Sequence, residues 1–98
     1  MVTETKFSTP NTKITTIDNT TYVKLHRTNI VIFDDKSIVL QTGGWNTPTT
    51  KTRMNQISAH FNLGYRVYQK NFEWFIETEF HQTLRFSPYD DIIFLRSL

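Results

Sequence analysis

The clearest structural signal in this chain of 98 residues is the run Asn29-Ile30-Val31-Ile32-Phe33-Asp34-Asp35-Lys36-Ser37-Ile38-Val39-Leu40-Gln41. Its first and last five residues are rich in β-branched side chains, which favour extended backbone. Three polar residues separate the two halves, which is a spacing typical of a β-hairpin. The run therefore predicts two antiparallel strands joined by a turn at residues 34–36.

A short helix is predicted to follow this hairpin. Pro48 disfavours helix immediately before it, and Thr49 or Thr50 is suited to cap a helix that begins there. An apolar stripe at positions i, i+3 and i+7 is formed by Met54, Ile57 and Phe61. Gly64 is suited to the left-handed conformation that ends a helix. We therefore expect a helix over residues 50–62, with this stripe buried against a sheet.

The remaining segments predict more strands around this helix. Residues 65–69 and 72–77 form a second predicted hairpin around Lys70-Asn71, with one face made by Phe72, Trp74 and Ile76. The tail is expected to end in a strand over residues 92–95. Residues 1–21 are rich in threonine and show little periodicity, so they are predicted to form an irregular polar arm, with a short strand near residues 13–17. The expected fold class is α+β: a small antiparallel sheet with a ββαββ core and one helix on a face, in a single domain over residues 22–98.

Length and composition exclude several classes of protein. A chain of this length makes one small domain. The absence of cysteine excludes a disulfide framework, a thiolate zinc site and a cysteine nucleophile. No apolar run is longer than four residues, and no secretory signal opens the chain. The expectation is therefore a cytoplasmic protein without membrane contact.

Charge is unevenly distributed along the chain. Residues 36–72 contain five cations and no Asp or Glu, whereas residues 73–98 contain two arginines and five acidic residues. An acid-free segment of this length favours a positive surface. Chance clustering in a weakly charged chain is the alternative.

The most specialised segment runs from Leu40 to Asn55 and combines a Gly-Gly turn, a tryptophan, several threonines and two cations. Free backbone N–H groups, hydroxyls and cations at a helix N-terminus are the components of an anion site, and the indole of Trp45 is suited to stack on a flat group. The predicted ligand- or phosphate-binding residues are Gly43, Gly44, Trp45, Thr47, Thr49, Thr50, Lys51, Arg53 and Asn55. The alternative is a scaffold, in which the glycines form a turn, Trp45 fills the core and the threonines cap the helix. The spacing of a phosphate-binding loop of the G-x-x-x-x-G-K-[ST] type is absent.

The second predicted hairpin offers a weaker candidate surface. Arg66, Tyr68 and Lys70 interleave cations with an aromatic ring, which suits single-stranded nucleic acid. Tyr68 and Phe75 are expected to be exposed, whereas Trp74 is expected in the core. A domain this small needs many of its rings for its core, which is the alternative for this hairpin.

Catalytic chemistry has little support in the sequence. His26, His60 and His81 lie far apart and match no metal-binding spacing. Glu77 and Glu79, joined by Asp90-Asp91, would make an acidic nuclease cluster for Mg²⁺, but solvated surface charge is the favoured interpretation. We therefore expect no enzyme activity, no metal and no cofactor.

The motif Thr42-Gly43-Gly44-Trp45, followed by Thr47, Thr49-Thr50-Lys51 and Arg53-Met54-Asn55, resembles a family of small phage-encoded proteins with related copies in bacterial genomes. Further matching positions lie at residues 65–69 and at Trp74, so that the resemblance covers residues 22–77. It implies a viral or mobile-element origin and action in an infected bacterial cell. It implies no established activity.

Two classes of function follow from these observations. The first is a non-enzymatic module that binds nucleic acid through the Gly-Gly-Trp turn and the helix start. The second is a phage counter-defence or host-takeover protein, which would bind a host protein or sequester a nucleotide signal in the same pocket. A metal-dependent nuclease is a distant third. Salt dependence separates the first two classes, because nucleic-acid binding through several cations weakens steeply with salt.

Overall fold

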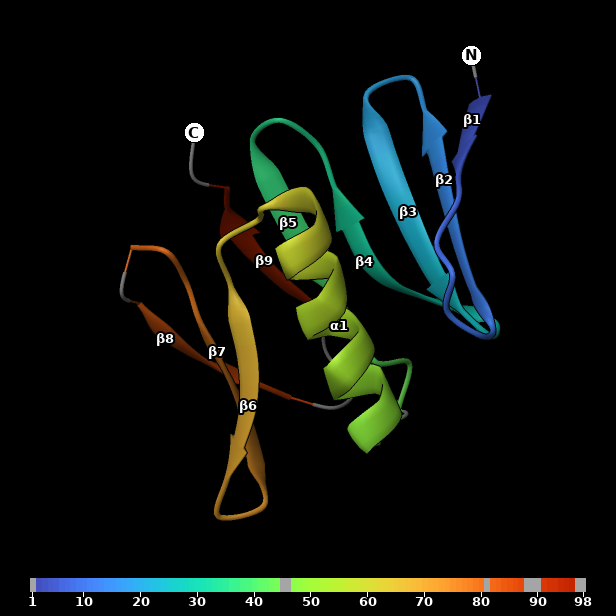
Figure 1. Cartoon of the computed structure of the whole chain (residues 1–98). Coiled ribbons are helices and arrows are strands. Elements are labelled where there is room, and N and C mark those ends of the chain that lie inside the picture. The colour runs from blue at the N-terminus through green and yellow to red at the C-terminus, as the bar shows by residue number, and fades with distance from the viewer. Residues whose placement is uncertain (1, 45–46, 81, 88–90, 97–98) are drawn as a thin grey trace.

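The computed structural model describes residues 2–44, 47–80, 82–87 and 91–96 and is shown in Figure 1. These residues form nine strands in two antiparallel sheets, together with one helix. The larger sheet has the strand order β1-β2-β3-β4-β5-β9, and the smaller has the order β6-β7-β8. The elements are β1 (Val2–Thr5), β2 (Thr12–Ile17), β3 (Thr20–Leu25), β4 (Thr28–Phe33), β5 (Ser37–Leu40), α1 (Pro48–Phe61), β6 (Arg66–Lys70), β7 (Glu73–Glu77), β8 (Thr83–Phe86) and β9 (Ile92–Leu95).

The predicted hairpin over residues 29–41 is confirmed as β4 and β5. The two strands pair antiparallel, with Ile32 opposite Val39. The turn is closed by the side chain of Asp34, whose Oδ1 accepts hydrogen bonds from the backbone amides of Lys36 (2.8 Å) and Ser37 (2.9 Å). These amide hydrogen bonds stabilise the carboxylate and lower the pKa of Asp34 below its ordinary value.

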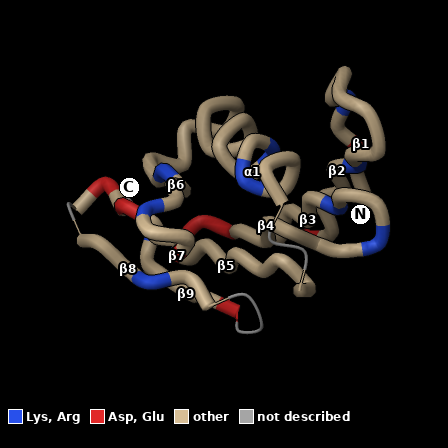
Figure 2. Tube along the Cα trace, turned by 90° about the horizontal axis from the view of Figure 1, so that it is seen from below, with Lys and Arg blue, Asp and Glu red and all other residues tan. Residues whose placement is uncertain are grey.

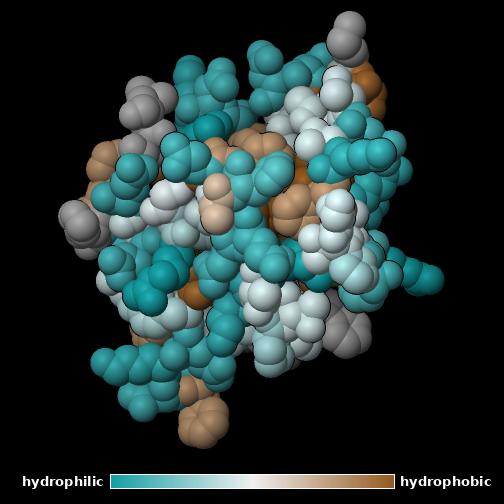
Figure 3. Space-filling model, viewed as in Figure 1, coloured by the Kyte–Doolittle hydropathy of each residue, from teal (hydrophilic) through white to brown (hydrophobic). Residues whose placement is uncertain are grey.

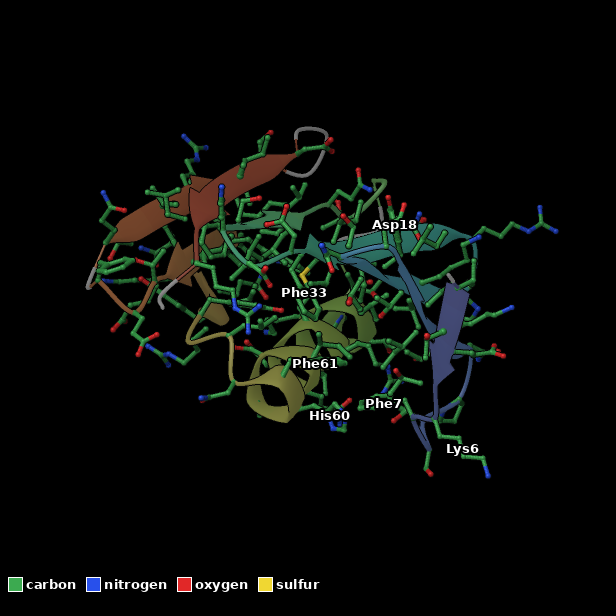
Figure 4. All side chains as sticks on the ribbon, turned by 90° about the horizontal axis from the view of Figure 1, so that it is seen from above. Lys6, Phe7, Asp18, Phe33, His60 and Phe61 are labelled. Atoms are coloured by element: carbon green, nitrogen blue, oxygen red, sulfur yellow. The ribbon has the colours of Figure 1, made fainter. Side chains whose placement is uncertain are left out.

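The predicted helix is confirmed as α1, which covers one face of the larger sheet (Figure 1). It ends at Asn62, which adopts the left-handed conformation (φ 56°) two residues before Gly64. Met54 and Ile57 are fully buried, as the apolar stripe predicts. Phe61 is only half-buried and packs against Phe33, with ring centroids 5.0 Å apart (Figure 4). The helix therefore packs on the sheet with its predicted apolar stripe, and its last turn lies at the edge of the core.

The expected fold class, a small sheet with a ββαββ core, is wrong. In the described residues the chain is mostly β, and the two predicted hairpins belong to different sheets. The strand at the end of the chain, β9, pairs with β5 across the larger sheet, whereas β8 pairs with β7. Local periodicity does not predict the pairing of β9 with β5, because these two strands are distant in sequence, and it does not mark β8, in which only Phe86 is buried.

The short strand expected near residues 13–17 is confirmed as β2, but the expectation that the rest of residues 1–21 is irregular is wrong. Residues 2–5 and 12–17 are strands, and every residue of β2 pairs with a residue of β3. Threonine is β-branched and favours extended backbone, so the threonine-rich composition was itself a strand signal. The apolar pattern is weak because Ile14 is the only residue of β2 that is buried. Phe7, in the connection between β1 and β2, contacts the ring of His60 on α1 (Figure 4).

The second hairpin forms as β6 and β7, but its turn lies one residue later than predicted. Asn71 and Phe72 occupy the turn with φ values of 52° and 66°. Phe72 is therefore not on the face of Trp74 and Ile76. It is 95 % exposed, and Figure 3 shows an apolar side chain standing alone at the end of this hairpin.

Candidate functional site: a pocket at the start of the helix

A pocket with a volume of about 460 Å³ lies between the start of α1 and the turn that joins β3 to β4. Its size is within the range of small-molecule sites. Leu25 and Ile30 give it an apolar floor, and Arg27 supplies a cation. The complete lining is Leu25, His26, Arg27, Thr28, Ile30, Thr42, Thr47, Thr49 and Thr50. No acidic residue is among these described lining residues, so nothing in the lining opposes a negatively charged ligand.

The wall on the sheet side depends on tight backbone geometry. His26 and Arg27 form the two-residue connection between β3 and β4, and His26 has a positive φ of 56°. Its backbone amide donates to the carbonyl of Asn11 (2.8 Å), which fixes the turn. Gly43, with a φ of 61°, lies so close to Thr28 that a Cβ on it would stand 2.9 Å from Thr28 Cγ2. Glycine at this position is therefore favoured by both backbone conformation and space, since a side chain would be strained and would displace Thr28.

The wall on the helix side is a capped helix start. Thr47 is the N-cap residue, and its Oγ1 accepts a hydrogen bond from the backbone amide of Thr50 (3.2 Å). The amide of Lys51 donates to the carbonyl of Thr47 (3.2 Å). Pro48 has no N–H to offer. Thr49 is thus the first-turn residue whose amide has no partner among the described residues, and its side chain is exposed at the pocket.

The structure brings several of the predicted site residues to this pocket. Thr47, Thr49 and Thr50 line it directly. Gly43 and Gly44 follow the lining residue Thr42, and the amide of Gly44 donates to Thr42 Oγ1 (3.2 Å). Trp45 lies outside the described residues, so its predicted stacking role remains a prediction.

The three remaining predicted residues do not line the pocket. Lys51 is half-buried on α1 outside the lining. Arg53 is only 8 % exposed, its Nη1 donates to Gln56 Oε1 (2.7 Å), and its Nε is buried without a partner among the described residues. Asn55 is engaged with β6, because its amide donates to the carbonyl of Val67 (2.8 Å) and accepts from the amide of Val67 (2.7 Å). In this arrangement Arg53 is not a mobile surface cation and Asn55 is a structural side chain.

The sequence analysis did not assign His26 and Arg27 to the site, and Arg27 is the residue that gives the pocket its charge. Both lie outside the acid-free segment that begins at Lys36. A signal was present: the polar residues His26, Arg27 and Thr28 separate the segments at residues 22–25 and 29–33, and a short polar break of this kind is typical of a hairpin.

The outward face of the smaller sheet carries the second predicted surface. Tyr68 and Phe75 were expected to be exposed, but both are half-buried because their rings stack, with centroids 5.7 Å apart and an interplanar angle of 25°. The guanidinium of Arg66 lies 4.9 Å from the centroid of Tyr68. Glutamates neutralise part of the charge here, since Arg66 pairs with Glu77 (3.4 Å) and Arg85 pairs with Glu73 (2.7 Å). Lys70 is exposed on the same hairpin.

Cations are spread over the molecule rather than gathered in one cluster. Figure 2 shows Lys and Arg on α1, on β6 and β8, and on the β2–β3 side of the larger sheet. Among the described residues, no three His, Asp or Glu side chains come together as metal ligands. Glu79 lies against Gly64, and Glu77 pairs with Arg66, so the two do not form a shared acidic site. Asp90 and His81 lie outside the described part of the chain.

Comparisons with known proteins place the chain in a family. No helix in the described residues is long and apolar enough to cross a bilayer. Neither the curated proteins nor the solved structures contain a match to this chain. A family model, described as Kyanoviridae Gp96 protein, matches residues 1–93 and so includes the N-terminal strands that the resemblance left out. The chain belongs to the Kyanoviridae Gp96 protein family, a family of phage proteins.

Proposed function

We propose that this phage protein is a non-enzymatic binding protein for a small phosphorylated ligand of the nucleotide type, which it holds at the start of α1. The observation that carries the proposal is the pocket between the helix start and the β3–β4 turn. In an infected host, such a protein would sequester a nucleotide signal, which is a counter-defence or host-takeover role.

The lining of the pocket supports a ligand with a flat apolar part and an anionic end. Leu25 and Ile30 provide an apolar surface on which a base can lie. Arg27 and the exposed hydroxyl and amide of Thr49 provide donors for phosphate oxygens. The helix start adds a partial positive charge of about half an elementary charge. Because the cap and Pro48 leave the first turn few free amides, Arg27 carries the larger share of phosphate recognition.

Titration calorimetry with inorganic phosphate and with nucleoside mono-, di- and triphosphates tests this proposal. We expect saturable binding of one nucleotide per chain. Arg27→Ala should weaken it by about tenfold or more, because it removes a charge-assisted hydrogen bond. Lys51→Ala is the matched control, since it removes one cation from α1 outside the pocket and should leave the affinity nearly unchanged. Equal losses in both variants, or no binding of any nucleotide, would contradict the proposal.

Single-stranded nucleic acid is the second candidate ligand, and the stacked pair of Tyr68 and Phe75 favours it. Stacking of a base on an aromatic ring is worth about 1–3 kcal/mol, these two rings are half-buried, Arg66 lies over Tyr68, and Lys70 is exposed on the same strand. The ion pairs with Glu73 and Glu77 weigh against it, because they compete with phosphates for the arginines.

Oligonucleotide binding measured over a range of salt separates the two candidates. A nucleic-acid module should bind a single-stranded oligonucleotide with an affinity that falls steeply with salt, and Tyr68→Ala should weaken it. A nucleotide pocket should show a mild salt response and no effect of Tyr68→Ala. A host protein that co-purifies from nuclease-treated lysate, with no binding of either ligand, would instead support the inhibitor form of the host-takeover role.

A further inference from the structure

A row of apolar side chains crosses the face of the larger sheet that is turned away from α1. The strand register places Tyr22 opposite Ile32, Ile32 opposite Val39, and Val39 opposite Ile93. Residues that pair directly across antiparallel strands point to the same face. These four side chains therefore form one line across β3, β4, β5 and β9, and Leu95 joins them two residues beyond Ile93.

The opposite face of the same strands is the core side. The residues that alternate with the row are buried with Met54 and Ile57 of the helix, and they include Val23, Val31, Ile38 and Phe94. The row therefore faces away from α1. In Figures 2 and 4 no described helix or strand lies over this outer face.

The row is exposed where β9 forms the edge of the sheet. Ile93 and Leu95 are 68 % and 73 % exposed, whereas Tyr22, Ile32 and Val39 are half-buried by their neighbours. An antiparallel sheet with one face on a core usually carries polar residues on the other face. A continuous apolar row is instead typical of an interface.

Two exposed residues of opposite charge flank this row on the same side. Lys24 follows Tyr22 by two residues on β3, and Asp91 precedes Ile93 by two residues, immediately before β9. The strands β3 and β9 run in opposite directions, because each of the three intervening pairings is antiparallel. Both charges therefore lie on the same side of the row, one near each end of it. Neither has an ion-pair partner among the described residues.

We propose that this face is the interface of a homodimer in which the apolar rows of two copies pack together. A two-fold axis parallel to the strands, passing between β4 and β5, lays β3 over β9 of the second copy and β4 over β5. Tyr22 then lies over Ile93 of the partner subunit, and Ile32 over Val39 of the partner subunit. The same rotation brings Lys24 opposite Asp91 of the partner subunit, and symmetry repeats this pair.

A second copy fits this face better than an unrelated partner, because one rotation pairs the apolar row with itself and also pairs the two flanking charges. An isologous interface requires a self-complementary patch. Here the row is apolar along its length. The two-fold axis brings the position of Lys24 over the position of Asp91 in the second copy, and these two residues have opposite charges. The resulting arrangement is the aligned packing of two sheets face to face, which is a common geometry for β-proteins.

Sedimentation equilibrium of the full chain tests the dimer. We expect the wild-type protein to sediment as a dimer, and Ile93→Lys to sediment as a monomer with an unchanged circular dichroism spectrum. Phe80→Lys is the matched control, because Phe80 is an exposed apolar residue (58 %) outside the larger sheet, and this variant should remain dimeric. A wild-type monomer at the highest concentration reached, or a dimer that persists in Ile93→Lys, would overturn the proposal.

A charge exchange tests the orientation of the two copies. Lys24→Asp and Asp91→Lys should each weaken the dimer, because each places like charges opposite one another. The double variant Lys24→Asp/Asp91→Lys should restore it. Additive weakening in the double variant would overturn the proposed two-fold arrangement.

Discussion

The side chain of Asn55 makes hydrogen bonds to the backbone of β6, of the kind that a neighbouring strand makes elsewhere in a sheet. Its side-chain amide both donates to and accepts from the backbone of Val67, at 2.8 and 2.7 Å. The sequence analysis counted Asn55 among the predicted ligand-binding residues at the helix start. Position alone could not distinguish that role from a structural one, because the backbone partner lies twelve residues away.

The substitution Asn55→Ala should lower the free energy of unfolding by about 2–3 kcal/mol, because it leaves the amide and carbonyl of Val67 without partners in a partly buried position. Chemical denaturation monitored by circular dichroism measures this change. Thr52→Ala, an exposed substitution on the same helix, is the control and should be nearly neutral. A loss below about 0.5 kcal/mol for Asn55→Ala would show that water replaces the side chain and that the link is weak.

Phe72 is a bulky residue in a backbone conformation that suits glycine. The hairpin turn requires a positive φ at both central residues, for which Asn-Gly is the preferred pair. Asn71 meets this preference, but Phe72 adopts a φ of 66° and exposes 95 % of its surface. The sequence did not reveal this, because the aromatic pattern placed Phe72 in the strand.

The variant Phe72→Gly should therefore be more stable than the wild type by about 0.5–1 kcal/mol. A non-glycine residue in the left-handed conformation costs about 1–2 kcal/mol, and glycine removes this cost from the folded state. The greater freedom of glycine in the unfolded chain offsets part of the gain in the free energy of unfolding. Phe72→Ala keeps the penalty and should show no gain. If thermal unfolding finds both variants equally stable, the turn is not strained by the side chain.

Among the elements, the central hairpin, the helix and the strands near residues 13–17 and 92–95 were predictable, whereas β1, β8 and the pairing of β9 were not. Residues 29–41 and 50–62 carry strong local signals: β-branched runs around a polar turn, and an apolar stripe after a threonine-rich segment. In contrast, β1 has no buried residue, β8 buries only Phe86, and β9 pairs with β5 across more than fifty residues. Short strands with at most one buried residue have little periodicity to detect, and long-range pairing is set by the whole sheet.

The β4–β5 turn makes a testable contribution to stability at low pH. Backbone hydrogen bonds hold the pKa of Asp34 below its ordinary value of 3.8. A carboxyl group with a lowered pKa in the folded state stabilises the fold fully above the ordinary pKa. This contribution is lost as the pH falls through the lowered pKa. Asp34→Asn, which keeps an oxygen acceptor for the two amides, should therefore show a shallower loss of stability with acid than the wild type. Denaturation curves collected from neutral pH downward measure the difference, and identical pH dependence in the two proteins would contradict this assignment.

For the whole molecule, the candidate site is built from three separated segments. The pocket gathers residues 25–28 and 30 from the β3–β4 hairpin, Thr42 from the segment after β5, and residues 47, 49 and 50 from the helix start. The sequence identified the last two segments, because glycines, threonines and a helix start are local features. The turn at His26 and Arg27 also has a local signal, but its position beside the helix start depends on how the larger sheet packs against α1.

The central claim is that a nucleotide binds in this pocket, and mapping of amide chemical shifts tests it most directly. Spectra of the isotope-labelled chain should be recorded while the tightest-binding nucleotide is added. We expect the shifted amides to cluster at residues 25–30, 42–44 and 47–50, with Thr49 among the most affected, and to stay small on β6–β8. Shifts confined to β6–β8 would place the ligand on the outer face of the smaller sheet, and shifts in neither region would remove the pocket from the function of this protein.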